Sequence, residues 1–279
     1  MNFLWIKNLR LEKKLEKQLE KQLPEQNLPA EDPEESEFAR TELLLGEAGL
    51  RRLMQSTVMV LGVGGVGSHC IEALARSGVG RLILVDNDRV SISNINRQSI
   101  ALHSTIGRYK TEVMKEKIAD ICPQTEVITY ECFILPENIE SIFDPMPDYV
   151  IDAVDTVTAK LAAIEKSIEY GIPIISSMGT GNKLHAELFE ITDISKTSVC
   201  PLSRVMRREL RSRGIEHLKV LYSAEKPIAA SKDDKPQHRQ PEDSRRRAVP
   251  GSISFVPSAA GLLIAGEVIR DLLHSEQKI

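Results

Sequence analysis

The stretch Ser56–Gly78, STVMVLGVGGVGSHCIEALARSG, decides the fold. It has the pattern of a buried strand that runs through Gly62-x-Gly64-x-x-Gly67 into a helix with apolar periodicity. Glycines allow a tight turn and a close approach of the backbone to phosphate, and the helix N-terminus supplies free amide groups. A second strand ends in Asp86, nineteen residues past Gly67, where a ribose-binding carboxylate is expected. The stretch therefore predicts a dinucleotide-type α/β fold with a nucleotide site at the turn.

Short strands alternate with helices outward from this motif. Helices are predicted near 66–77, 110–121 and 157–170. Apolar strands in this alternation indicate a Rossmann-like, mostly parallel sheet flanked by helices. The predicted strands are Thr57–Leu61, Arg81–Val85, Glu126–Glu131, Tyr149–Asp152 and Pro173–Ser176.

The regular alternation of short parallel strands and helices ends after residue 183. A strand-like AELFEI (186–191) precedes a basic helix, Pro201–Arg213, and a second strand, HLKVLY (217–222). These elements predict a smaller, mixed C-terminal extension of the sheet. The polar stretch 223–251 has too little apolar surface to offset the entropy of ordering it, so we expect a mobile loop there.

The length and local composition of the chain indicate an N-terminal arm followed by one larger domain. The chain has 279 residues and a formal net charge of −4. Residues 1–35 combine a leucine-spaced helical arm with a proline-rich, acidic linker, and residues 36–274 form the predicted nucleotide-binding domain. The N-terminal apolar stretch is too short for a signal peptide or a membrane span. The apolar run Gly261–Leu273 contains the charged residues Glu267 and Arg270, which favours a packed amphipathic helix over a membrane span. We expect no membrane attachment.

The four cysteines lie far apart, and the chain holds no CxxC pair. We therefore expect reduced thiols, a cytoplasmic location, and neither a disulfide framework nor a structural zinc.

The glycine turn alone suits an NAD-dependent dehydrogenase equally well. The segment that follows Asp86 argues for a different chemistry, because it is rich in groups that bind a triphosphate. A dehydrogenase needs little positive charge beyond its pyrophosphate contact, whereas nucleotidyl transfer needs several cationic donors and usually a metal. Candidate ATP-binding groups besides the glycines Gly62, Gly64, Gly65 and Gly67 are Asp86, Asp88, Asn94, Arg97, Gln98 and Lys110.

Two further carboxylates follow the strand Tyr149–Asp152. Asp152 and Asp155, in DAVDT, come at its C-terminal end, where ligands bind in open α/β sheets. Mg²⁺ takes one or two carboxylates together with phosphate oxygens. Asp155 is therefore a candidate Mg²⁺ ligand.

With these motifs, the chain resembles the adenylation domain of the ubiquitin-activating superfamily, which includes activators of sulfur-carrier proteins. The resemblance covers about residues 36–274 and rests on the glycine turn, DNDRVSISNINRQ (86–98), Lys110 and DAVDT. Within the superfamily the chain is similar to the tRNA threonylcarbamoyladenosine dehydratases. The stretches that carry this similarity are FARTELLLGEAGL, ARSGVGRL, PIISSMGTGNK, the DISKT and PLSRVMR segments, and SFVPSAAGLLIAGEVI.

The resemblance implies a role for each matching residue. Asp86 would hold the ribose, Asn94, Arg97 and Lys110 the phosphates, and Asp155 the Mg²⁺. Arg40 would reach into the site of a neighbouring subunit, which makes the active unit a homodimer. The implied catalytic set is Arg40, Arg97, Lys110 and Asp155.

The implied activity is an ATP-dependent cyclising ligase. It adenylates the carboxylate of threonylcarbamoyladenosine in tRNA and closes the ring with release of AMP. A sulfur-relay system with a cysteine desulfurase is a further expected partner. The alternative is an activating enzyme for a ubiquitin-like or sulfur-carrier protein, which binds a protein tail instead of RNA. The missing zinc pairs and the basic helix favour the RNA substrate.

A tRNA substrate needs a basic surface, and residues 196–219 are rich in Lys and Arg. The candidate RNA contacts are Arg204, Arg207, Arg208 and Arg211. Cys200, just before this helix, is either a chance substitution or a thiol that accepts an acyl or sulfur group.

Overall fold

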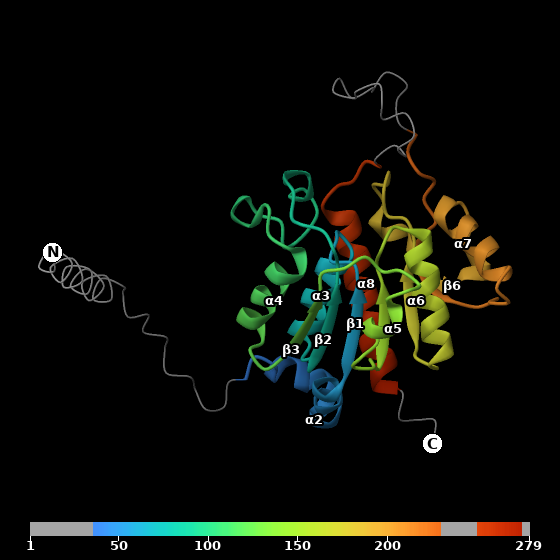
Figure 1. Cartoon of the computed structure of the whole chain (residues 1–279). Helices are drawn as coiled ribbons and strands as arrows, with labels where there is room; N and C mark the ends of the chain where they lie inside the picture. Colours follow the sequence, from blue (N-terminus) through green and yellow to red (C-terminus); the bar gives the residue numbers. More distant parts are fainter. Residues whose placement is uncertain (1–35, 230–249, 275–279) are drawn as a thin grey trace, which may run out of the picture. The chain divides into compact units, whose positions relative to one another are not determined.

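The computed structural model describes residues 36–229 and 250–274, so the predicted arm over residues 1–35 lies outside the described residues. The sheet and its helices belong to the compact unit Arg40–Ile279. In the described part of this unit, seven strands form one sheet in the order β3-β2-β1-β4-β5-β7-β6 (Figure 1). All neighbours are parallel except β6 and β7, which pair antiparallel. The predicted fold class is confirmed.

The first five strands begin and end within one residue of their predicted bounds. The strands are β1 Thr57–Leu61, β2 Arg81–Val85, β3 Glu126–Tyr130, β4 Tyr149–Asp152, β5 Ile174–Ser177, β6 Phe189–Asp193 and β7 Lys219–Ser223. Two helices, α2 and the short α5, lie where no helix is predicted. The helices are α2 Ala39–Gln55, α3 Gly67–Arg76, α4 Lys110–Ile121, α5 Ile139–Ile142, α6 Val157–Glu169, α7 Pro201–Arg211 and α8 Phe255–His274.

The strand predicted over 186–191 begins later than expected. Residues Ala186–Leu188 form a 3-10 turn, and β6 starts only at Phe189. The cause is Glu225, whose carboxylate accepts hydrogen bonds from the backbone amides of Leu184 and His185 and so turns the chain before the strand.

Asn182 holds the described ends of the loop predicted over 223–251. Its carbonyl accepts from the Ile228 amide, and its side-chain oxygen accepts from the Gly251 amide. Residues 230–249 lie outside the described part of the chain, and the mobility of the loop stays a prediction.

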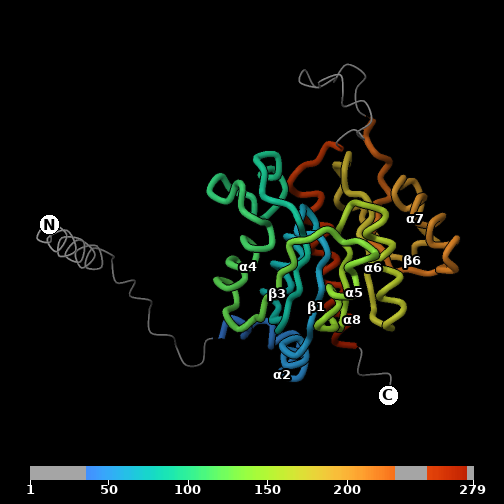
Figure 2. Tube along the Cα trace, in the orientation of Figure 1, coloured from blue at the N-terminus to red at the C-terminus, as the bar shows by residue number. Residues whose placement is uncertain are grey.

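Strand alternation separates two apolar layers on the faces of the sheet. On one face, Val58 and Val60 of β1 pack with α3, α4 and α8. On the other, Met59 and Leu61 pack with α5, α6 and α7. Both faces are covered, as near-continuous apolar strands require. Figure 2 follows the chain from α2 into strand β1. Among the described helices, none combines the length and apolarity that a membrane span needs.

Helix α8 comes unusually close to α3. A methyl group added at Gly261 of α8 would lie 2.4 Å from the Val66 carbonyl oxygen and 3.0 Å from the Cys70 amide nitrogen. These atoms belong to the backbone and cannot turn away as a flexible side chain can. The first turn of α3 therefore fixes the identity of residue 261.

Substitution of Gly261 with alanine should destabilise the fold by about 1–3 kcal/mol, as overpacking of a tight contact does. Gly266→Ala is the matched control in the same helix, because the nearest atom there is Arg270 Nη1, the end of a flexible side chain, at 3.4 Å. The control should gain about 0.5–1 kcal/mol from helix propensity. Urea unfolding of both variants measures the difference, and equal shifts of the same sign would contradict the close contact.

Candidate active site

The carboxyl edge of the sheet has a switch point between β1 and β4. The chain continues from β1 to β2 on one side, whereas β4 lies on the other. Ligands bind at such a crevice in open α/β sheets. Gly62 directly follows β1 with φ of +94°, and a side chain on it would lie 2.8 Å from the Ala153 carbonyl oxygen. A methyl group on Gly67 would lie 1.8 Å from the Gly62 carbonyl oxygen, so the start of α3 also rests directly on the turn.

The two middle glycines face different surroundings. A side chain on Gly64 would meet nothing closer than the amide nitrogen of Gln98, at 4.0 Å. One on Gly65 would lie 3.1 Å from Pro257, in the first turn of α8. Gly64 therefore leaves open space where a phosphate group can approach the backbone, and α8 supports the turn from its other side.

Asp86 joins the turn to the segment after β2. Its carboxylate accepts hydrogen bonds from the amide of Val63, at 2.7 Å, and from the amide of Asp88, at 2.8 Å. Lys110, at the start of α4, is almost fully buried and donates to Asp88 at 2.6 Å, with Asp86 at 3.6 Å. Burial raises the pKa of Asp86, although Lys110 and the two amides oppose that shift. The structure thus brings Asp86, Asp88 and Lys110 together beside the glycine turn.

The segment Asn94–Gln98 crosses the same edge. Asn94 caps its own 3-10 turn through a bond from the Ser91 amide to its side-chain oxygen. The Arg97 guanidinium donates to the Ser93 carbonyl and to Asn96. Gln98 is buried, and its side-chain oxygen has no hydrogen-bond partner among the described residues. A buried acceptor without a partner marks a place where a ligand donor fits.

The two carboxylates after β4 have separate environments. Asp152 is fully buried and pairs with Lys160 of α6 at 3.0 Å; Ser176 of β5 donates to the same carboxylate. Lys160 also donates to the Ser177 carbonyl at 2.7 Å. Asp155 is exposed, and no hydrogen bond or ion pair engages its side chain in the described part of the chain. Of these two carboxylates, Asp155 is therefore the one whose oxygens remain available to a metal.

The structure does not bring Arg40 to this site. It lies near the start of α2 and lines a pocket together with Ser77, at the end of α3, and Ile269 of α8. Helix α3 has 10 residues, so its end is about 15 Å from the glycine turn. Figures 1 and 2 show α2 at the end of the sheet where β1 begins, opposite the loops that follow β1 and β2.

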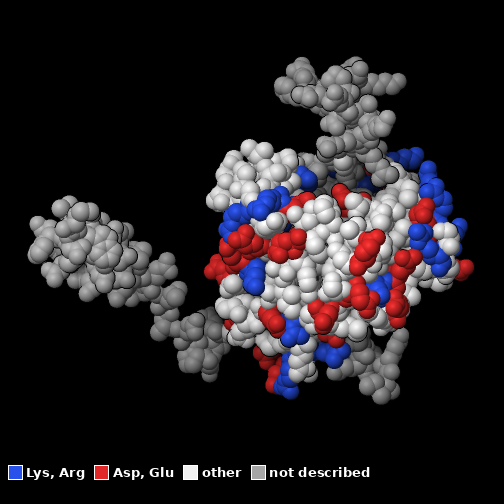
Figure 3. Space-filling view, viewed as in Figure 1, with Lys and Arg blue, Asp and Glu red and all other residues white. Residues whose placement is uncertain are grey.

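The candidate RNA contacts lie together on α7, and Lys and Arg side chains gather along this edge of the molecule (Figure 3). Arg207 donates to the Thr197 carbonyl, and Arg208 pairs with Glu209. For the side chains of Arg204 and Arg211 the structure records no ion pair within residues 36–229 and 250–274. Those two are the cations of the set most available to a phosphate backbone.

Several residues of the site are absent from the sequence prediction. The sequence analysis does not identify Lys160, because its spacing of eight residues from Asp152 does not indicate that α6 brings the two side chains together. His69 was missed because its partners are Arg97 and Ser258, which are distant in sequence.

Cys200 is buried at the N-terminus of α7. Among the described residues, no group of three His, Cys, Asp or Glu side chains lies together as metal ligands.

Comparison with known proteins gives a consistent family. Residues 38–279 match the ThiF family. The chain is 48% identical over 240 residues to a tRNA threonylcarbamoyladenosine dehydratase of Bacillus subtilis, covering 85% of this chain and 94% of that protein.

Solved structures agree with this match. The Escherichia coli tRNA N6-threonylcarbamoyladenosine dehydratase TcdA in complex with AMP superposes with a TM-score of 0.78 at 29% identity, over 87% of this chain and 96% of that one. The same enzyme in complex with ATP gives a TM-score of 0.77. The chain therefore belongs to the ThiF family, and its relatives in that family include tRNA threonylcarbamoyladenosine dehydratases.

Proposed function

We propose that this protein is an ATP-dependent dehydratase that cyclises threonylcarbamoyladenosine in tRNA through an acyl-adenylate. One observation carries the proposal above the others. At the β1/β4 switch point, the open backbone at Gly64 lies beside the side-chain amide of Gln98, whose buried oxygen has no hydrogen-bond partner among the described residues. The chain is also a relative of a dehydratase solved with ATP and with AMP. A dehydrogenase site does not account for the cations Arg97 and Lys110 at the same edge.

The site residues fit a bound ATP. In the proposed arrangement the glycine turn holds the phosphates, Asp86 accepts from the ribose hydroxyls, and Asn94, Arg97, Gln98 and Lys110 contact the triphosphate. Lys110 is held between two carboxylates in the described structure, at 2.6 and 3.6 Å. Its charge is therefore placed in advance and needs little reorganisation when negative charge develops on the phosphates.

The chemistry explains why ATP is needed. Ring closure formally removes water from a carboxylate, and an oxide is a poor leaving group. The carboxylate therefore first attacks the α-phosphate of ATP, which forms an acyl-adenylate and releases pyrophosphate. A nucleophile of the same modified nucleoside then attacks the acyl carbon and displaces AMP. Because both groups belong to one nucleoside, the protein contributes mainly positioning and charge stabilisation.

A magnesium ion fits the donor set at this edge. Asp155 offers an exposed carboxylate that is not engaged elsewhere in the described residues, and Mg²⁺ completes its coordination with phosphate oxygens and water. Asp152 does not take part, since Lys160 already neutralises it. The ion would withdraw charge from the phosphates during transfer.

The proposed partners follow from the surface and the site. The arginines of α7 would contact the tRNA backbone, and Arg40 of one subunit would complete the site of the other in a homodimer. Arg40 is accompanied by two nearly fully exposed leucines, Leu43 and Leu44, which suit a subunit interface. A sulfur-relay partner is proposed only by analogy with the sulfur-carrier activators. The four cysteines are free, which suits a cytoplasmic location.

The decisive assay supplies the protein with Mg-ATP and tRNA that carries threonylcarbamoyladenosine. We expect AMP to form in step with loss of one water from the nucleoside, read by mass spectrometry. Candidate carrier proteins take the place of tRNA in a parallel reaction. AMP formation with a carrier protein and an unchanged nucleoside mass with tRNA would reject the dehydratase.

The trans role of Arg40 is tested by mixing two inactive proteins. Arg40→Ala and Asp155→Ala should each lower AMP formation at least about tenfold, because each removes charge stabilisation from phosphoryl chemistry. A hybrid dimer contains one site with both native residues. An equal mixture should therefore recover about a quarter of the wild-type sites by random pairing. No recovery from subunits that have been unfolded and reassociated together would place Arg40 outside the partner's site.

Asp86 predicts a pH dependence of ATP binding. Its carboxylate must be ionised to accept from the ribose, and its raised pKa means that it takes up a proton at a higher pH than an ordinary aspartate. The KM for ATP should therefore rise on acidification, and the rise should begin above the usual aspartate range. Asp86→Asn should have a higher KM without this added acid rise. ATP takes up protons equally in both assays, so identical pH profiles would exclude Asp86 as the titrating group.

A further inference from the structure

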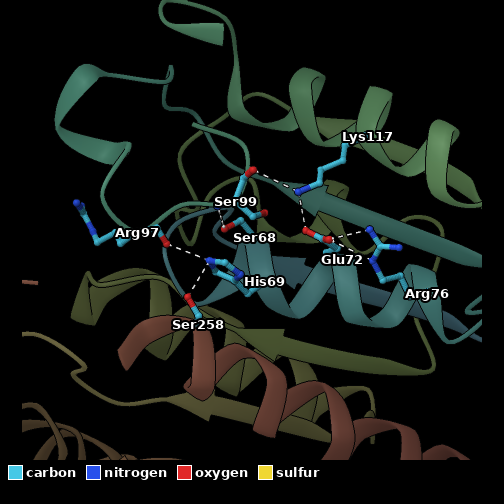
Figure 4. Close-up of polar contacts among 8 residues, drawn as sticks. All are labelled: Ser68, His69, Glu72, Arg76, Arg97, Ser99, Lys117 and Ser258. Atoms are coloured by element: carbon cyan, nitrogen blue, oxygen red, sulfur yellow. Dashed lines mark hydrogen bonds and ion pairs between the residues drawn. The ribbon is translucent and has the colours of Figure 1, made fainter. Parts of the chain in front are cut away.

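Three polar contacts hold the main chain of Arg97–Ser99 against the neighbouring helices (Figure 4). His69 Nε2 lies 3.1 Å from the Arg97 carbonyl oxygen. The Ser99 amide donates to Ser68 Oγ at 3.1 Å, and Lys117 of α4 donates to the Ser99 carbonyl at 3.2 Å. His69 and Ser68 both belong to the first turn of α3, directly after the glycine turn. The backbone that carries Arg97 is thus fixed to helix α3, which begins at the glycine turn.

The position of the proton on His69 follows from its partners. Nε2 also lies 2.9 Å from Ser258 Oγ, and that hydroxyl donates its own hydrogen to the Ser254 carbonyl. A carbonyl oxygen can only accept, so Nε2 must carry a hydrogen, which it shares between Arg97 and Ser258. The imidazole is therefore the donor in both contacts and connects α3, the Arg97 segment and α8.

Each of the three connected parts touches the nucleotide turn. Helix α3 begins on it, and Pro257, next to Ser258, packs against Gly65. In the third part, a methyl group on Gly65 would lie 3.4 Å from Arg97 Cγ. The carbonyl of Arg97 turns toward His69, while its guanidinium points away from His69 (Figure 4). A shift of this backbone would move the side chains of Arg97 and Gln98 together.

A second support lies behind His69, one turn along α3. Glu72 accepts from Lys117 at 2.6 Å and from Arg76 at 3.0 Å. Burial alone would raise the pKa of Glu72, but these two cations outweigh it and the pKa is lowered. Lys117 is therefore held beside the Ser99 carbonyl by an ionised carboxylate. Arg76, in contrast, contacts Glu72 from the exposed side and does not reach the Arg97 segment (Figure 4).

We propose that His69 is a positioning residue for the adenylation step, which holds the Arg97 backbone so that the Arg97 and Gln98 side chains meet the ATP phosphates. The proposal rests on the proposed function, since it assigns His69 a task only if Arg97 binds the nucleotide. His69 does not touch the substrate. It acts through the carbonyl of Arg97, and the geometry of the guanidinium depends on it.

Three variants separate positioning from packing. His69→Phe keeps an aromatic ring and removes the donor, whereas His69→Gln places an amide donor at the same distance along the side chain. Lys115→Ala is the control, because Lys115 is an exposed residue of the neighbouring helix α4 and lies outside these contacts in the described part of the chain. His69→Phe should lower kcat for AMP formation about three- to tenfold, the change that one ordinary hydrogen bond gives, with a smaller effect on the tRNA KM. His69→Gln should recover most of that loss, and Lys115→Ala should match the wild type.

A double-mutant cycle tests whether His69 acts through Arg97. In an Arg97→Ala background, His69→Phe should cause little further loss, because the side chain that it positions is gone. Full additivity of the two losses, or no rescue by His69→Gln, would overturn the proposal, as would wild-type kcat in His69→Phe. Melting temperatures of all variants identify a loss that comes from unfolding. A wild-type protein that forms no AMP would reject the proposed function itself, which distinguishes the two failures.

Discussion

The carboxylate of Asp86 is the contact on which the site depends, because it binds two main-chain segments that the sheet alone leaves separate. One oxygen receives the Val63 amide from the glycine turn, and the other receives the Asp88 amide from the segment after β2. This arrangement draws Lys110 into a nearly buried position between two acids. A buried ammonium group is unfavourable without such partners. The turn, the phosphate-binding segment and the start of α4 are therefore coupled through one side chain.

A second buried pair, Asp152 with Lys160, holds the chain in place after β4. The pair is fully enclosed, and Ser176 together with the Ser177 carbonyl completes its hydrogen bonds. Such pairs contribute little net stability, but breaking one leaves an unpaired charge in the interior. Its effect here is geometric, because it fixes the short connection that leads from Asp152 to Asp155. One acid of DAVDT serves the fold, and the other remains exposed.

The sequence predicts the strands well because each is a short apolar run between clear turns, and both faces of the sheet are covered. It predicts the α8 run for the same reason. Helix α2 is less evident, since Gly46 interrupts it with non-helical angles and two of its leucines are exposed. The strand near residue 186 is displaced by Glu225, almost forty residues later in the chain, which no local pattern reveals. The site residues chosen from the glycine turn to Lys110 lie at one edge because parallel strands end together. The supports of that edge, His69 and Lys160, escape prediction because their partners are set by packing.

Helix α8 packs against the glycine turn although the two are far apart in the sequence. Gly65 packs on Pro257 and the start of α3 packs on Gly261, which follow the turn by about 190 residues. At a synthesis rate of about 5–20 residues per second, the turn leaves the ribosome about 10–40 s before the helix that supports it. During that interval the apolar face of α3 has no cover from α8, and the nascent domain carries its phosphate-binding motif without the wall behind it. Assembly of the nucleotide site is therefore a late event in the biosynthesis of this protein, although its defining motif is among the first parts of the sheet to be made.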